Sequence, residues 1–126
     1  MKHYSFIFLL IMIPFFMGCK EINLTIEDSG KTIQIAQGDV IHISLVSNKS
    51  TGNTWRKVNF DSSVLQEISD PVYKMDRENA IGAPGKVIYS FKAIKKGVSE
   101  IYMEYGSFTD LSKPPVKTFR LEVVVK

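Results

Sequence analysis

The chain has 126 residues, of which 16 are lysine or arginine and 13 are aspartate or glutamate, and its formal net charge is +3. Removing Lys2, which lies in the leader described below, leaves 15 basic against 13 acidic side chains, a net charge of +2. So small an excess gives no reason to expect nucleic acid or an acidic protein as a partner. The single cysteine excludes an internal disulfide, so an exported domain must fold without one.

The N-terminal residues have the pattern of a secretion signal. A short basic start precedes an apolar run from Phe6 to Met17. The run suits the h-region of a signal and is too short for an ordinary membrane-spanning helix. Gly18-Cys19 follows it directly, and together with the two preceding residues it resembles a bacterial lipobox, in which Phe16 replaces the usual leucine.

This resemblance implies a signal peptide over residues 1–18 and a lipid on Cys19. The mature domain, residues 19–126, would then be exported and anchored by its lipid to a bacterial cell membrane, facing the periplasm or the cell surface. The alternatives are an uncleaved anchor and a secreted protein whose cysteine stands there by chance.

Alternating apolar and polar residues predict three strands in the first part of the mature chain. The clearest has Ile41, Ile43 and Leu45 on one face, with His42 and Ser44 on the other. The two earlier strands, around residues 22–26 and 32–35, are each followed by residues typical of turns.

The second part of the chain predicts further strands separated by two long loops. Residues 55–60 form a short strand candidate, and residues 64–73 are ambiguous because Pro71 limits how central that segment can be. Clear alternation returns in three segments: 87–93, 98–105 and 119–125. Between the strand segments, 74–86 and 106–116 are interpreted as loops.

No stretch of ten or more residues has helical periodicity. Seven or eight short strands with regular turn signals predict an all-β fold, an Ig-like antiparallel β-sandwich, expected to be a monomer. Its core would come from the alternating inner faces of two sheets.

The residues that usually carry catalysis or bind metals are scarce. There are two histidines, of which His42 alone lies in the mature chain, and Cys19 would be acylated. We therefore expect no metal site, no cofactor and no nucleophile–histidine pair. A pair of carboxylates remains possible, but a sandwich of this size offers little room for a sugar-binding cleft. The sequence favours a binding protein over an enzyme.

Three loops stand out because strand periodicity stops there and turn-forming residues take over: Asn48 to Thr54, Gly82 to Gly85, and Lys113 to Pro115. Sandwich loops cluster at the two ends of the sheets, so these three could share one end. The first is a polar loop between a strand and Trp55, a position that is often functional. It could equally be an ordinary strand connection.

In order and spacing, the three stretches resemble the chagasin family of cysteine-peptidase inhibitors. The family pattern is Asn-Pro-Thr-Thr-Gly-Tyr/Phe-x-Trp, then Gly-x-Gly-Gly, then Arg-Pro-Trp. This chain has Asn48-Lys49-Ser50-Thr51-Gly52-Asn53-Thr54-Trp55, then Gly82-Ala83-Pro84-Gly85, then Lys113-Pro114-Pro115. The resemblance covers nearly the whole mature domain.

Four positions depart from that pattern. Lys49 replaces a proline and so removes a rigid φ, and Asn53 replaces an aromatic residue. Pro84 stands where glycine is typical, and Pro115 stands where tryptophan is typical. Loss of a buried tryptophan contact would cost about 2 kcal/mol or more of binding. These changes bear on potency and target choice more than on the fold.

The resemblance implies a reversible inhibitor of papain-like cysteine proteases, from a host or from the cell itself. Ser50, Thr51 and Gly52 would lie over the catalytic cysteine and histidine, where Gly52 permits close backbone approach. Gly82 to Gly85 and Lys113 to Pro115 would grip the two sides of the cleft.

Other side chains near these loops are interpreted as support. Asn48 is expected to shape the first loop through hydrogen bonds to the backbone, and Trp55 is expected to contribute more to the core than to contact. Pro114 and Pro115 stiffen the third loop, which suits an inhibitor that binds through preorganised loops.

Two other functions remain open. A lipid-anchored Ig-like adhesion or assembly module would have its partner surface on a sheet face or edge and would bind no protease. A small glycan-binding sandwich would expose aromatic rings, for which Tyr102 and Phe108 are the evident candidates.

Overall fold

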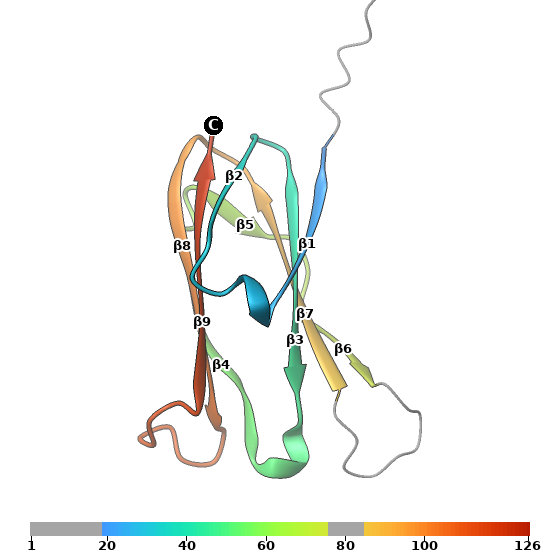
Figure 1. The fold of residues 1–126 in the computed structure, drawn as a ribbon, viewed down its shortest axis with the longest axis vertical. Coiled ribbons are helices and arrows are strands. Elements are labelled where there is room, and N and C mark those ends of the chain that lie inside the picture. Colours follow the sequence, from blue (N-terminus) through green and yellow to red (C-terminus); the bar gives the residue numbers. More distant parts are fainter. Residues whose placement is uncertain (1–18, 76–84) are drawn as a thin grey trace, which may run out of the picture.

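The computed structural model describes residues 19–75 and 85–126, which form two β-sheets packed face to face (Figure 1). The predicted signal peptide and Gly82 lie outside the described residues. The strands are β1 (Glu21–Thr25), β2 (Thr32–Ile35), β3 (Val40–Ser47), β4 (Asn53–Asn59), β5 (Leu65–Glu67), β6 (Val72–Met75), β7 (Gly85–Ala93), β8 (Gly97–Ser107) and β9 (Lys117–Val125). Two single-turn 3-10 helices, η1 (Ile26–Asp28) and η2 (Lys49–Thr51), interrupt them.

The two sheets have the arrangement of an Ig-like sandwich. One sheet has the order β1-β3-β7-β5, with β6 also paired to β7, and the other has the order β2-β9-β8-β4. The all-β sandwich predicted from the sequence is confirmed. The described residues contain nine strands instead of seven or eight, because the ambiguous segment 64–73 contributes to two short strands that both pair with β7.

Both sheets are mixed and not purely antiparallel as predicted. β1 pairs with β3 in parallel, and β2 pairs with β9 in parallel. The reason lies at η1, where the chain crosses between the sheets and the amide of Gly30 donates to the carbonyl of Arg120 on β9, at 2.7 Å. Apolar alternation indicates which face of a strand is buried but carries no information on its direction.

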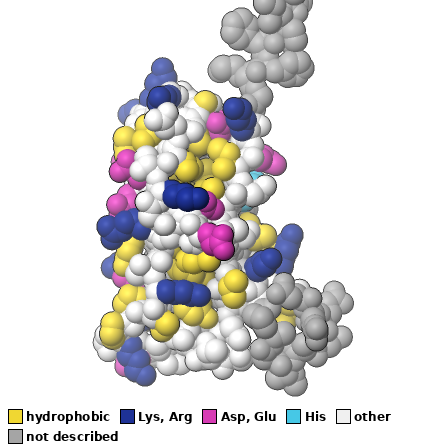
Figure 2. Space-filling model, in the orientation of Figure 1, with side chains coloured by type: hydrophobic (Ala, Val, Ile, Leu, Met, Phe, Trp, Pro, Cys, Tyr) yellow, Lys and Arg dark blue, Asp and Glu magenta, His cyan; other side chains and the backbone are white. Residues whose placement is uncertain are grey.

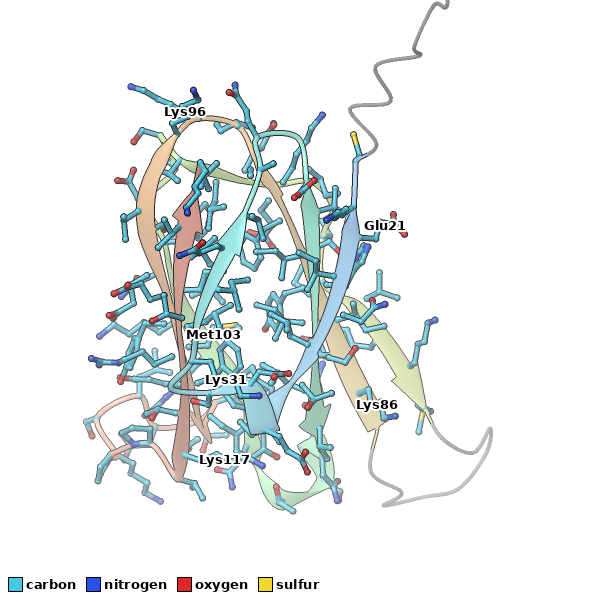
Figure 3. The ribbon with its side chains drawn as sticks, turned by 45° about the horizontal axis from the view of Figure 1, so that its top comes forward. Glu21, Lys31, Lys86, Lys96, Met103 and Lys117 are labelled. Carbon is cyan, nitrogen blue, oxygen red and sulfur yellow. The ribbon has the colours of Figure 1, made fainter. Side chains whose placement is uncertain are left out.

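The core lies between the sheets and comes from the alternating residues that the sequence indicates. Ile41, Ile43 and Leu45 of β3 are completely buried, and His42 and Ser44 point to the other face. From the second sheet, Met103 lies in the interior between the sheets (Figure 3). Further completely buried side chains of the core are Leu65, Val87, Phe91, Ala93, Ile101, Phe119, Leu121 and Val123.

Candidate functional site

The loops singled out in the sequence lie at one end of the sandwich. Strand registers place Ser47 beside Gly85, and Asn53 beside Ser107, so the ends of β3 and β8 and the starts of β4 and β7 meet there. In Figure 1 this is the lower end, where η2 and the loop between β8 and β9 lie. We call it the loop end. Cys19, directly before β1, lies at the opposite end, because Glu21 pairs with Val40 at the start of β3.

The first loop is a capped turn of 3-10 helix. Asn48 is its N-cap, and its side-chain oxygen accepts from the amide of Ser50 at 3.2 Å and from the Ser50 hydroxyl at 2.5 Å. The hydroxyl of Thr51 donates to the backbone carbonyl of Asn48 at 2.7 Å. These bonds satisfy helix-end groups that would otherwise need water, so the loop holds its own shape. Asn48 therefore has the shaping role that the sequence predicts.

Gly52 ends this turn in the left-handed conformation, with φ of 82° and ψ of 5°. Its amide donates to the carbonyl of Lys49 at 3.0 Å, which closes the turn. No heavy atom lies within 4 Å of the position that a Cβ would take there, so the space beside Gly52 is open. Glycine is favoured by the backbone conformation and not by crowding within this chain. The tip of the loop can therefore be approached closely from outside.

Asn53 and Trp55 belong to β4 and not to the loop itself. Trp55 is 5% exposed, its indole N–H donates to the carbonyl of Val46 at 3.0 Å, and its ring lies 5.2 Å from the ring of Tyr105. The hydroxyl of Tyr105 in turn lies 3.2 Å from the amide of Asn48, which donates to it. Trp55 thus supports the first loop from below, in agreement with its interpretation as core.

Gly85 is a strand residue, which corrects its placement in a loop. It is the first residue of β7 and pairs with both Ser47 and Met75. A Cβ at this position would lie 2.9 Å from the carbonyl oxygen of Lys74, so glycine permits the close approach of β6 to β7. Polar composition suggested a loop over residues 74–86, but backbone pairing in a hairpin does not require apolar side chains.

The loop between β8 and β9, residues 108–116, is joined to the first loop through Phe108. The amide of Phe108 donates to the carbonyl of Gly52 at 3.2 Å, and its side chain is 48% exposed. Sequence reasoning considered Phe108 only as a ring for glycan stacking. One signal could have identified Phe108 as a candidate site residue: it directly follows a long strand, at the end of the sandwich that carries the other loops.

Lys113, Pro114 and Pro115 lie on the returning side of the same loop. Lys113 and Pro114 are exposed and Pro115 is half-buried. The amide of the next residue, Val116, donates to the carbonyl of Tyr105 at 2.7 Å and closes the loop. The structure therefore places this stretch at the same end of the sandwich as the first loop, but the residue that contacts Gly52 is Phe108.

The middle of loop 108–116 is a turn built on Asp110. Its carboxylate accepts from the amide of Ser112 at 3.0 Å and from the Ser112 hydroxyl at 2.5 Å. These hydrogen bonds, the side-chain one first, hold the pKa of Asp110 below its usual value. Since the ionised carboxylate is the stronger acceptor, the hydrogen bonds of this turn are strongest at neutral pH and weaken when acid protonates Asp110.

A recess lies on the other side of the first loop. It has a volume of about 300 Å³ and is bounded by η2 and by the adjoining ends of β6 and β7. The ammonium of Lys49 lies 4.1 Å from the centre of the Tyr73 ring, so it links the first loop to β6. Lys86, an exposed residue at the start of β7, also lines the recess (Figure 3).

The rest of the described surface shows no concentration of charge on the face seen in Figure 2, where basic and acidic side chains are interspersed. Within residues 19–75 and 85–126, no group of three or more His, Cys, Asp or Glu side chains is placed to hold a metal ion. In the same part of the chain, no helix has the length and apolar character needed to cross a membrane.

Several solved structures share this fold. The cysteine protease inhibitor EhICP2 from Entamoeba histolytica is 24% identical with a TM-score of 0.76, and the alignment covers 85% of this chain and 96% of that one. Amebosin is 26% identical with a TM-score of 0.66, covering 84% and 98%. PbICP-C, solved in complex with falcipain-2, is 19% identical with a TM-score of 0.53, covering 86% and 92%.

No curated protein matches the chain. The family described as "Chagasin family peptidase inhibitor I42" matches residues 34–123, which run from β2 into β9 and include the first loop and loop 108–116. The match covers more than half of the chain and the whole loop end. The chain therefore belongs to the chagasin family of peptidase inhibitors.

Proposed function

We propose that this protein is a reversible inhibitor of papain-like cysteine proteases that inserts its loop end into the active-site cleft. Family membership supports peptidase inhibition, and the solved relatives EhICP2 and PbICP-C are described, respectively, as a cysteine protease inhibitor and as bound to falcipain-2. In this proposal the chain blocks access to the cleft and performs no chemistry of its own.

The observation that carries the insertion is the joined pair of loops at one end of a rigid sandwich. Gly52 sits at an open tip, and its carbonyl accepts from the amide of Phe108 in the neighbouring loop. Two loops that hold one another do not have to be ordered on binding, so less affinity is lost to entropy. A wedge of this kind needs no reactive group.

Within this wedge, Ser50, Thr51 and Gly52 would lie over the catalytic cysteine and histidine, where a glycine backbone can approach most closely. Phe108 would supply the large apolar contact beside them, because its ring is half exposed and its backbone is fixed to Gly52. Lys113 and Pro114, exposed on the returning side of the same loop, would contact one wall of the cleft.

The direct test is inhibition of papain and of a cathepsin L-type protease by the chain from Lys20 onward, which contains all the described strands. We expect reversible, substrate-competitive inhibition by a protein whose circular dichroism shows a folded β-domain. Absence of inhibition at micromolar concentration by the folded protein would contradict the proposal and favour a lipid-anchored binding module without inhibitory activity.

We also propose that the domain is exported and held at a bacterial membrane by a lipid on Cys19. Cys19 is exposed and lies two residues before Glu21, which pairs with Val40 at the end of the sandwich opposite the loops, so a lipid there would leave the loop end free for a protease. β1 begins at Glu21, and the amide of Lys20 already donates to the Asp39 carboxylate at 3.1 Å, so the anchor would be short.

This second proposal predicts that Cys19→Ser abolishes incorporation of a labelled fatty acid in a bacterial expression host. The parent should incorporate the label and sediment with membranes, because acylation of the cysteine supplies the anchor. The variant should be found without label. A parent chain that takes up no label would contradict the lipid anchor, and it would leave the inhibition proposal untouched.

A further inference from the structure

Arg56 of β4 lies at the foot of loop 108–116 with its guanidinium turned toward that loop. The side chain is only 10% exposed. One terminal nitrogen donates to the carbonyl of Ser107 at 2.9 Å and, over a longer 3.4 Å, to that of Asp110. The other donates to the carbonyl of Lys113 at 2.5 Å. One side chain from a neighbouring strand therefore binds the start, the middle and the returning side of the loop.

The sheet beneath Arg56 is shaped to accept it. Gly106 of β8 lies opposite Thr54, and a Cβ on Gly106 would be 3.0 Å from the central carbon of the guanidinium. The carboxylate of Glu104 lies 3.9 Å from the inner nitrogen, so the half-enclosed positive charge has an acidic neighbour. A buried guanidinium that lacked both acceptors and a counter-charge would be costly, and here it has both.

Arg56 holds the middle of loop 108–116, which the hydrogen bonds at the two ends of the loop do not reach. The amides of Phe108 and Val116 fix the two ends, to Gly52 and to Tyr105. Between these points the Asp110 turn is held by local bonds within the loop. Arg56 ties this middle part to the sheet through bonds from a charged donor, which are stronger than neutral ones.

We propose that Arg56 is a positioning residue for protease inhibition: it preorganises loop 108–116, with Phe108 at its start, in the conformation that enters the cleft. This role rests on the proposed function, since it concerns affinity for the protease. Without Arg56 the loop samples other conformations. The apparent affinity is then the intrinsic affinity multiplied by the fraction of molecules whose loop is in the binding-competent conformation.

The test compares Arg56→Met, which keeps an unbranched apolar stem, with Arg120→Met as a control. Arg120 lies on β9 and is 60% exposed beside Glu100, so this variant makes the same change of net charge away from the loop. We expect Arg56→Met to raise the inhibition constant for papain about tenfold and Arg120→Met to leave it unchanged. Amide hydrogen exchange at Lys113 and Val116 should speed up in Arg56→Met and stay unchanged in Arg120→Met.

Gly106→Ala gives an independent perturbation, because its Cβ would displace the guanidinium while Arg56 and its charge remain. We expect weaker inhibition and faster loop exchange in Gly106→Ala too. Arg56→Lys, which keeps the positive charge, should inhibit papain more strongly than Arg56→Met and less strongly than the parent. Circular dichroism at the assay temperature checks that each variant is folded. If Arg56 served only the overall stability of the domain, the folded variants would have the same inhibition constant as the parent.

The outcomes separate this role from the proposed function. Parent-level inhibition by folded Arg56→Met, with unchanged loop exchange, would overturn the role of Arg56 and leave the function standing. Absence of inhibition by the parent itself would overturn the proposed function and this role with it.

Discussion

Replacing Gly52 with tryptophan is expected to weaken inhibition of papain by about 100-fold or more, which corresponds to about 2.7 kcal/mol. No heavy atom lies within 4 Å of the position of a Cβ at Gly52, so the new side chain starts in open space and we expect the domain to fold. The same side chain would occupy the volume that a protease must fill to approach the loop tip. The inhibition constant of the purified variant measures this effect directly.

The matched control is Gly52→Asn, because asparagine adopts a positive φ more readily than other residues with side chains. Both variants meet the same backbone demand at φ of 82°, and a non-glycine residue there costs about 1–2 kcal/mol of folding free energy. Thermal unfolding temperatures should therefore fall in both proteins, less in Gly52→Asn than in Gly52→Trp, and both should remain folded at the assay temperature. Equal inhibition by the two variants would show that bulk at Gly52 does not obstruct binding, and the insertion proposal would fail.

The sequence predicted the sandwich well because its strands have one buried face. At Ile41, Ile43 and Leu45 the period of two is unbroken, and those side chains are fully buried. Turn residues also located the first loop. Asparagine commonly accepts hydrogen bonds from nearby backbone amides, as Asn48 does, and glycine readily adopts the left-handed conformation, as Gly52 does. Local chemistry was sufficient at these positions.

The features that could not be predicted from the sequence, such as strand direction and the roles of Gly85 and Arg56, depend on contacts between segments far apart in the chain. The parallel partners of β1 and β2 follow from a crossing at η1 that leaves no trace in apolar alternation. Gly85 reads as a loop glycine, but its role is to let β6 approach β7. The sequence did not single out Arg56, because its acceptors lie 51 to 57 positions further along the chain.

Phe108 illustrates why the candidate site was only partly predicted. The third stretch was identified at Lys113-Pro114-Pro115 because strand periodicity stops there and turn-forming residues take over. The structure shows that β8 continues to Ser107, so Phe108 is the first residue beyond the sheet and the one joined to Gly52. Strand length, which propensity predicts poorly at element ends, decided which residue of the loop meets its neighbour.

Truncating this ring, Phe108→Ala, is expected to raise the inhibition constant for papain about 30-fold, equivalent to about 2 kcal/mol, the size typical of a central aromatic contact. Its amide still donates to Gly52, so the loops stay joined. Because half of the ring is already exposed, thermal stability should change little. Competitive inhibition assays and thermal unfolding of the same preparation measure both quantities.

Leu111→Ala is the matched control, because Leu111 is a more exposed apolar residue of the same loop, at 73%. Equal losses in the two variants would mean that general apolarity of the loop matters and that the Phe108 ring has no special place. If Arg56 holds the ring in position, the two effects must also be coupled, since a ring on a loosened loop contributes less. The double variant Arg56→Met, Phe108→Ala should then lose less affinity than the sum of the single losses, and strict additivity would separate the ring from its proposed support.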